Sequence, residues 1–241
     1  MKKIISLCVL MVFFLIAGFS QQVKQVASSE PQKALNIRPN VVTSFNSEAS
    51  APDISDKAFV DPQSAVIGKV HLGDNVYVAP FASVRGDEGT PIWIGSNTNI
   101  QDGVIIHALE TQEHGQPVEK NLMEAGGKKY AVYVGNHVSL AHQCQVHGPS
   151  VVEDDSFIGM QAFVFRSRVG KNCVVEPGAK LIGVNVADNH YVPAGLVVTT
   201  QAEADKLPAI TGDYIYKDLN KGVLHVNEQL AENYLKQSRG Y

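Results

Sequence analysis

An aliphatic side chain recurs every six residues through the middle of this 241-residue chain. The pattern keeps its phase at first, resumes after an insertion, and continues with small slips almost to residue 200. A fixed period of this kind indicates a repeat architecture, in which each repeat buries its apolar face against its neighbours. The positions in phase are Val60, Val66, Leu72, Val78, Val84, Ile94, Ile100, Ile106, Val134, Leu140, Val146, Val152, Ile158, Val164, Val169, Val175, Leu181, Val186, Val192 and Val198.

Turn-forming residues follow these aliphatic positions, as in Gly73-Asp74 and Gly135-Asn136. Such residues suit tight corners between short strands. The pattern predicts an all-β solenoid with a C-terminal helix: a parallel β-helix of hexapeptide repeats, with three flat sides in a coil of about 18 residues. Coils then stack about 4.8 Å apart. Left-handed coiling is expected from the likeness to hexapeptide-repeat proteins, since right-handed crossovers are the general rule.

The repeat sets the expected domain organisation. Residues 56–200 form the predicted β-helix, which an acidic loop at residues 109–130 interrupts. Residues 21–55 form an extended segment before it, and residues 201–241 form helices packed on it.

Two features predict these C-terminal helices. Thr200 is placed to cap a short helix that Pro208 ends. Apolar residues then recur at helical spacing, which indicates a last helix lying along one side of the solenoid. This stripe consists of Val223, Val226, Leu230 and Tyr234.

Residues 1–20 have the composition of an export signal peptide. Lys2 and Lys3 precede an apolar run at residues 4–17, and small residues separate that run from a polar stretch. The run is shorter than the roughly 20 apolar residues of a spanning helix. We therefore expect cleavage, no membrane span in the mature chain, and export to the extracellular or cell-envelope space.

The charge of the mature chain argues against nucleic acid as a partner. Removal of Lys2 and Lys3 lowers the basic count from 20 to 18 against 24 acidic residues. No basic stripe remains to neutralise phosphates. Cys8 leaves with the signal, and Cys144 and Cys173 are expected to be small buried hydrophobic residues.

Counting along the repeat places Val84, Ile106 and Val146 on one side of the solenoid. Arg85, His107 and His147 each come one residue later, so they stack in one column. His107 and His147 then lie on adjacent rungs, about 5 Å apart, where two imidazoles can share one metal ion.

His142 lies two residues after Leu140, on a different side of the solenoid. A third ligand from His142 would therefore have to come from a neighbouring molecule, which predicts a homotrimer with three metal sites between subunits. Three neutral histidines with an open fourth position are typical of catalytic zinc, and imidazole also suits iron(II) and cobalt. The alternative is that these are solvated surface histidines without a metal. The positions of the three histidines relative to the repeat disfavour that alternative.

The segments ASVRGDEG (82–89), NIQDGVIIHALE (99–110), SLAHQCQVHGP (139–149) and QAEADKLP (201–208) resemble the γ-class carbonic anhydrases. These are trimeric left-handed β-helix metalloenzymes, and the likeness runs from about Phe45 to near the C-terminus. It is closest to archaeal members with an export leader and an acidic loop.

The resemblance implies a metal site at each subunit interface, with His107 and His147 from one chain and His142 from the next. Zn²⁺ is the expected metal, and Fe²⁺ or Co²⁺ suits the same ligands. A metal-bound hydroxide would then hydrate CO2 reversibly to bicarbonate and a proton.

The resemblance also assigns roles to four polar residues. Glu110, on a mobile loop near the ligand His107, matches the proton-shuttle glutamate, and Glu88 matches a glutamate near the metal-bound water. Gln101 matches a glutamine that hydrogen-bonds this water. Asn227 either caps the last helix or matches an asparagine that orients CO2 or bicarbonate.

Arg85 and Asp87 are interpreted as an ion pair between subunits, with recognition of an anion by Arg85 as the alternative. Two positions depart from the archaeal pattern. His225 stands where those members have tyrosine, and Phe45 where they have tryptophan. Both concern substrate handling and not metal binding.

Two other functions compete with this interpretation. A hexapeptide acyltransferase needs only one histidine as general base, and it works inside the cell. A metal-binding trimer without turnover, serving as an assembly subunit, is the third. The joint presence of Glu88, Gln101 and Glu110 favours the enzyme.

Overall fold

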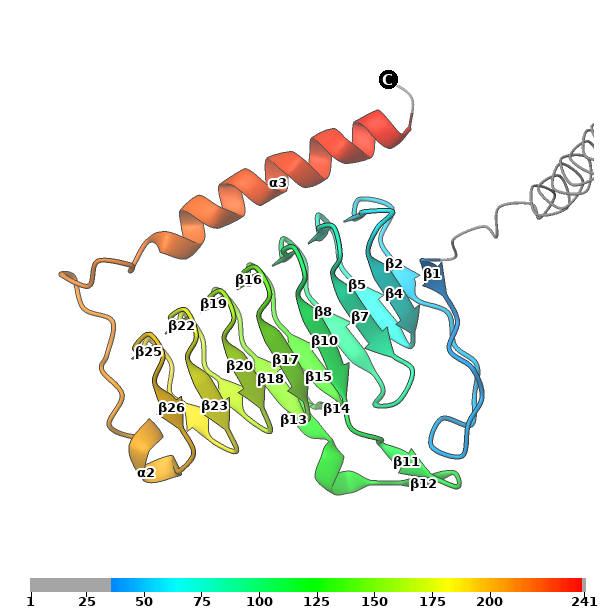
Figure 1. Ribbon diagram of the computed structural model, residues 1–241, viewed down its shortest axis with the longest axis horizontal. Coiled ribbons are helices and arrows are strands. Elements are labelled where there is room, and N and C mark those ends of the chain that lie inside the picture. The colour runs from blue at the N-terminus through cyan, green and yellow to red at the C-terminus, as the bar shows by residue number, and fades with distance from the viewer. Residues whose placement is uncertain (1–35, 240–241) are drawn as a thin grey trace, which may run out of the picture. The chain divides into compact units, whose positions relative to one another are not determined.

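The computed structural model describes residues 36–239, which form a parallel β-helix with three faces and a long C-terminal helix (Figure 1). The export signal predicted at residues 1–20 lies outside the described residues. Face 1 consists of β3 (Phe59–Val60), β6 (Tyr77–Val78), β9 (Asn99–Ile100), β16 (Ser139–Leu140), β19 (Phe157–Ile158), β22 (Val174–Val175) and β25 (Tyr191–Val192).

Face 2 consists of β1 (Ile37–Arg38), β4 (Ala65–Gly68), β7 (Ser83–Gly86), β10 (Ile105–Ala108), β17 (Gln145–Gly148), β20 (Phe163–Phe165), β23 (Lys180–Ile182) and β26 (Val197–Val198). Face 3 consists of β2 (Asp53–Ile54), β5 (Val70–Leu72), β8 (Ile92–Ile94), β15 (Val132–Val134), β18 (Ser150–Val152), β21 (Arg168–Val169) and β24 (Asn185–Val186).

The residues in phase form the core of the solenoid. Ile106 pairs with Val84 on one side and with Val146 on the other, and Leu140 pairs with Ile100, as the six-residue count predicts. All the residues in phase except Val60 are buried. The prediction of a hexapeptide-repeat β-helix is therefore confirmed, and hydrophobic burial along one continuous column stabilises it.

Left-handed backbone marks the corners between faces 3 and 1. This conformation is unfavourable for most residues, but asparagine adopts it more readily because its short polar side chain bonds locally. The amide of Asn75 donates to Asn97 over 3.0 Å, and that of Asn172 donates to Asn189 over 2.8 Å. The corner residues with positive φ are Asn75, Asn97, His137, Asp155, Asn172 and Asn189.

The solenoid begins earlier than residue 56, the boundary that the repeat predicts. β1 pairs with β4, and β2 pairs with β5. Ile54 of β2 lies six residues before Val60, so it continues the phase, but Ile37 of β1 has no such relation. Part of the segment expected to precede the β-helix thus supplies strands to faces 2 and 3.

The acidic loop at residues 109–130 contains two hairpins. β11 (Gln112–Glu113) pairs with β12 (Gln116–Pro117), and β13 (Met123–Ala125) pairs with β14 (Lys128–Tyr130). A short 3-10 helix, η1 (Glu119–Asn121), joins them. The second hairpin packs on face 3 through aromatic contacts among Tyr130, Trp93 and Tyr133.

Two helices follow the last coil. Thr200 caps α2 (Gln201–Ala204) in a capping box with Glu203, as the sequence predicts. α3 (Leu219–Ser238) runs along face 1, where Phe59 stacks against Tyr234 (Figure 1). Among the described residues, no helix has the length and apolar character to cross a membrane.

The start of α3 corrects one interpretation. The helix begins at Leu219, after Asp218, so Asn227 lies in its interior and is not its N-cap. The apolar stripe begins only at Val223, four residues after the first helical residue, and it therefore gives no signal for the turns around the helix start. Those turns are held by Asn220, which donates to the carbonyls of His137 and Asp155.

Candidate metal centre

Strands β10 and β17 bring two histidines together on face 2. His107 and His147 are register partners, and their ring centroids lie 5.5 Å apart with planes at 83°. Both side chains point away from the core, because each follows an inward-facing aliphatic residue in its strand. The column predicted from the sequence is therefore present.

The environment of His107 favours a neutral imidazole. Burial lowers the pKa of His107 below its ordinary value, and the positive charge of Arg85 lowers it further, against the opposing effect of Glu88 and Asp87. Arg85 Nη2 lies 3.0 Å from His107 Nε2, and Asp87 Oδ1 lies 3.3 Å from the same nitrogen. A neutral ring is the form that binds a metal ion.

The tautomer of His147 is set by the backbone. Its Nδ1 lies 3.0 Å from the carbonyl oxygen of Gly148, which can only accept, so Nδ1 carries the proton. The lone pair then resides on Nε2. A histidine that ligates a metal commonly donates its other ring proton in this way.

His142 lies on the corner that follows β16, away from the pair. Its Nδ1 faces Asp102 Oδ2 at 3.0 Å, which likewise leaves Nε2 free, and about half of the side chain is exposed. Within residues 36–239, no three His, Cys, Asp or Glu side chains lie together as a group that could hold a metal ion. The structure thus presents two histidines on face 2 and one on the border of face 1.

Acidic groups and an arginine surround the pair. Glu88 Oε2 lies 3.6 Å from His107 Nε2. Arg85 Nε lies 3.4 Å from Asp87 Oδ1 within the same subunit, and the role of these two residues between subunits stays a prediction. Asn46 donates to the carbonyl of Asp87 over 3.2 Å, which places the turn containing Phe45 beside this site.

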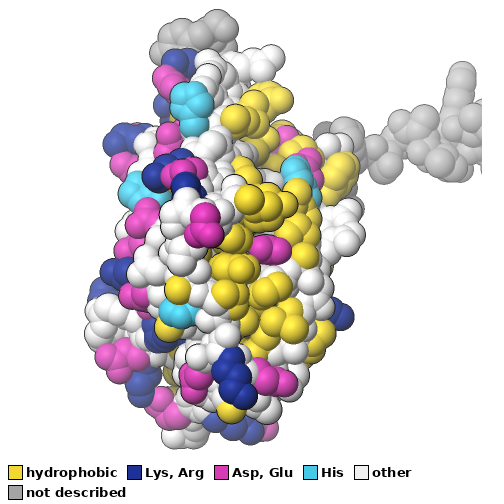
Figure 2. All heavy atoms as spheres, turned by 90° about the vertical axis from the view of Figure 1, so that its left-hand side faces the viewer, with side chains coloured by type: hydrophobic (Ala, Val, Ile, Leu, Met, Phe, Trp, Pro, Cys, Tyr) yellow, Lys and Arg dark blue, Asp and Glu magenta, His cyan; other side chains and the backbone are white. Residues whose placement is uncertain are grey.

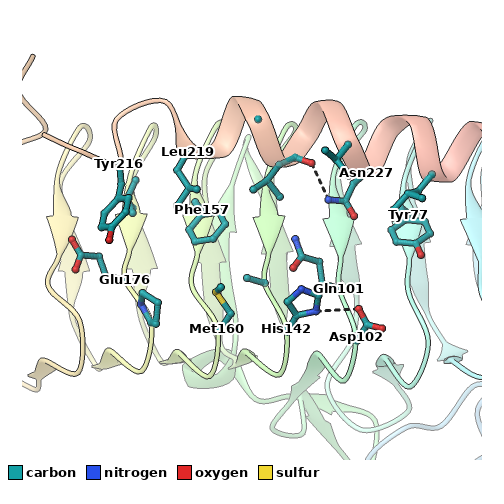
Figure 3. A pocket seen from close by; sticks show the side chains of 17 residues that line it. Tyr77, Gln101, Asp102, His142, Phe157, Met160, Glu176, Tyr216, Leu219 and Asn227 are labelled. Carbon is teal, nitrogen blue, oxygen red and sulfur yellow. Dashed lines mark hydrogen bonds and ion pairs between the residues drawn. The ribbon is translucent and has the colours of Figure 1, made fainter.

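A groove of about 550 Å³ lies between part of face 1 and α3 (Figure 3). His142, Gln101 and Asn227 line it together with apolar side chains. Asn227 donates to the carbonyl of Val223 over 2.8 Å, which fixes its amide inside α3. His142, Gln101 and Asn227 therefore form a second group, distinct from the histidine pair.

Asn99 is a site residue that the sequence analysis missed. Its oxygen accepts from Gln101 over 2.9 Å, and its amide donates to Ser139 over 2.8 Å, so the chain Ser139–Asn99–Gln101 fixes the glutamine. Asn99 is only 1% exposed. Asparagine is depleted in strands. An asparagine directly before the in-phase residue Ile100 was therefore the sequence signal that could have marked Asn99 as a site residue.

Glu110 lies at the exit from β10, three residues after His107, and it is half-buried. Its carbonyl oxygen accepts from Asn121 Nδ2 over 2.8 Å. This bond ties the backbone of Glu110 to η1, and the mobility expected of the loop stays a prediction.

Several named proteins are similar to this chain. The carbonic anhydrase of Methanosarcina thermophila is 59% identical over 84% of this chain and 83% of its own length. The carboxysome assembly protein CcmM of a Nostoc species is 41% identical over 80% of this chain but only 33% of its own. Gamma carbonic anhydrase 1, mitochondrial, of Arabidopsis thaliana is 34% identical over 64% of this chain and 50% of its own.

Solved structures support the fold. A hexapeptide transferase family protein from Anaplasma phagocytophilum matches 80% of this chain and 93% of its own with a TM-score of 0.51 at 21% identity. No protein-family model matches the chain. High identity over most of both chains, together with the histidine pair on a hexapeptide-repeat β-helix, shows that this chain belongs to the γ-class carbonic anhydrase family.

Proposed function

We propose that this chain catalyses the reversible hydration of CO2 to bicarbonate and a proton at metal sites shared between subunits of a homotrimer. The pairing of His107 with His147 on adjacent rungs carries the proposal. Membership of a carbonic anhydrase family supports the reaction.

The donor set fits a divalent metal ion. His142 and His147 each have a partner at Nδ1 and a free Nε2, and His107 is favoured in its neutral form. Three neutral imidazoles suit Zn²⁺, and they also accept Fe²⁺ and Co²⁺. A divalent ion held by them supplies Lewis acidity that makes water a nucleophile near neutral pH, for which carbonic anhydrases are the standard example.

A trimer would complete each site. If face 2 of one subunit lies against the groove on face 1 of the next, His142 of the neighbour approaches the pair, and such head-to-tail contacts close into a ring. Exposed apolar side chains on and beside face 2, including Ile105, Met160 and Val197, favour burial between subunits. Figure 2 shows apolar side chains gathered in a band with most charged side chains beside it.

Polar residues of the chain would manage the proton and the substrate. Glu88, 3.6 Å from His107 Nε2, is placed to accept the proton that water gives up. Gln101 and Asn227, whose amides are fixed by Asn99 and Val223, can orient the reactants by hydrogen bonds. Glu110 would pass the proton to buffer.

Stopped-flow CO2 hydration by the purified protein tests this function. The protein is loaded anaerobically with zinc, cobalt or iron(II), and His107→Ala is the control. We expect hydration that requires metal and falls at least about a hundredfold in the variant, as for loss of an essential catalytic group. Absence of hydration by an intact, metal-loaded trimer would overturn the proposal.

A second candidate is an assembly subunit without turnover. The CcmM relative, described as a carboxysome assembly protein, is 41% identical over 80% of this chain. The two candidates differ in one measurement, since only the enzyme hydrates CO2 when its metal sites are full.

A further inference from the structure

Glu110 is anchored from both directions along the backbone. On one side its carbonyl oxygen accepts from Asn121 Nδ2 over 2.8 Å. On the other, the buried Thr111 exchanges two hydrogen bonds with Thr90: it accepts from the backbone N–H over 3.0 Å and donates to the carbonyl over 2.9 Å. The side chain of Glu110 therefore extends from a fixed point.

Asn121 is fully engaged at the centre of this anchor. It ends η1, it is 1% exposed, and its backbone N–H donates to the carbonyl of Val118 over 3.0 Å. Its amide nitrogen donates to the carbonyl oxygen of Glu110, and its amide oxygen accepts from Arg166 Nη2 over 3.2 Å. Loss of either partner would leave a buried polar group unsatisfied, which is costly.

Arg166 has a backbone conformation that its residue type disfavours. Its φ is +50°, in the left-handed region, where a long side chain is strained. Phe165 pairs with Ile182, so the equivalent position one coil later is Gly183, which has φ +71°. The next coil therefore has glycine at this corner, whereas this coil has an arginine in spite of the strain. Strain of this kind persists where surrounding interactions fix it, and it is concentrated at functional sites.

The guanidinium of Arg166 also connects the backbone of Glu110 with the histidine pair. It lies over the ring of Phe165 at 5.5 Å from the centroid, and that ring meets His147 edge-on at 5.4 Å. A continuous set of contacts therefore runs from His147 through Phe165, Arg166 and Asn121 to the backbone of Glu110.

We infer that Asn121 and Arg166 are positioning residues that hold the backbone of Glu110, three residues after His107, in place for proton transfer. The inference rests on the proposed function, in which Glu110 relays the proton. Neither residue touches the reacting groups. Each acts through the Glu110 backbone, so its loss affects the return of the proton and not the attack on CO2.

Two variants separate this role from folding. Arg166→Gly removes the guanidinium and relieves the left-handed strain, and it reproduces the residue found one coil later. Asn121→Asp keeps the oxygen that faces Arg166 and loses the donor to Glu110. Lys129→Ala is the matched control, because it breaks an exposed ion pair with Glu119 on the same loop.

We expect both variants to lower kcat about tenfold at low buffer concentration, a fraction of what a whole acid–base group contributes. The value of kcat/KM for CO2 should stay within about twofold of wild type, because this ratio reports steps before the proton leaves. A small diffusible buffer such as imidazole should restore kcat. Lys129→Ala should change none of these values.

A second readout does not depend on activity. In the metal-free protein, amide hydrogen exchange across residues 109–122 should be faster in both variants and unchanged in the core strands. Equal losses in kcat and kcat/KM, or unchanged exchange, would overturn the inference. A third outcome would also overturn the inference: both variants behave like wild type, while Glu110→Gln has a low kcat that buffer restores. The proposed function would then remain intact. A wild-type protein without CO2 hydration would contradict the proposed function itself, and the exchange measurement would still decide whether Asn121 and Arg166 fix the backbone.

Discussion

At the residue scale, hydrogen bonds set the ring orientation of two of the three histidines proposed as metal ligands. His142 and His147 each use Nδ1 for a hydrogen bond, one to a carboxylate and one to a backbone carbonyl. Because the tautomer and the ring orientation are set in advance, less conformational entropy is lost on metal binding. His107 is prepared differently, by burial and by the charge of Arg85.

The pKa of His107 provides a test of this environment. Burial is the larger cause of its lowered pKa and Arg85 the second. In Arg85→Gln, we expect the pKa of His107 to rise above its value in the wild-type protein, because one of the two main causes that lower it is removed. An imidazole NMR titration of the metal-free protein measures both. A pKa that does not rise in the variant would contradict the assigned influence of Arg85.

The sign of the stability effect follows from the same shift. A histidine with a folded-state pKa below its unfolded value contributes its full stability above the unfolded pKa, near 6.5. As the pH falls below that value the unfolded chain binds the proton first, so the metal-free fold is destabilised. Part of this pH dependence should disappear in His107→Gln.

At the level of the elements, the coils stack so closely that no space is left for an added side chain beside the histidine pair. A Cβ added to Gly148, at the end of β17, would lie 2.2 Å from the carbonyl oxygen of Ala131 and 2.6 Å from Ala108 Cβ. Backbone cannot move aside as a flexible side chain would. Gly148 also supplies the carbonyl that holds His147.

We therefore expect Gly148→Ala to destabilise the protein by about 2 kcal/mol, as for other overpacked sites. Gly212→Ala is the control, since a Cβ there meets nothing within 4 Å. Urea unfolding with matched m-values measures the difference. Equal stability of the two variants would show that the stacking tolerates a shift.

The sequence predicts the faces well because one physical rule governs them. Each residue in phase buries an aliphatic side chain, so counting in sixes places Arg85, His107 and His147 correctly on face 2. Residues held by hydrogen bonds across distant segments obey no such period. Asn121 and Arg166 are 45 positions apart, and the local sequence pattern gives no sign of the contact between them.

At the scale of the whole molecule, the proposed trimer would build each metal site from two parts that one chain keeps apart. His107 and His147 lie on face 2, and His142 lies on the border of face 1. A single mutation on either half should therefore abolish every site in a homotrimer, although the other half stays intact in each subunit.

Mixing two such variants tests the shared site. Trimers of His142→Ala alone, or of His147→Ala alone, should lose the metal. In an equal mixture that exchanges subunits, about one quarter of the sites should regain the metal. Such a site needs a His142→Ala subunit to supply the intact histidine pair and a His147→Ala neighbour to supply the intact His142. Metal content of the purified trimers gives the result, and complete absence of metal from the mixture would exclude sharing.

The place of the histidine pair within the stack has a consequence for its rigidity. In face 2, three strands precede β10 and three follow β17. A solenoid opens from its ends, because a terminal coil has only one neighbour and each coil contacts only those beside it. Fraying at either end must therefore pass through several coils before it reaches His107 or His147, so the two histidines lie where such opening is rarest.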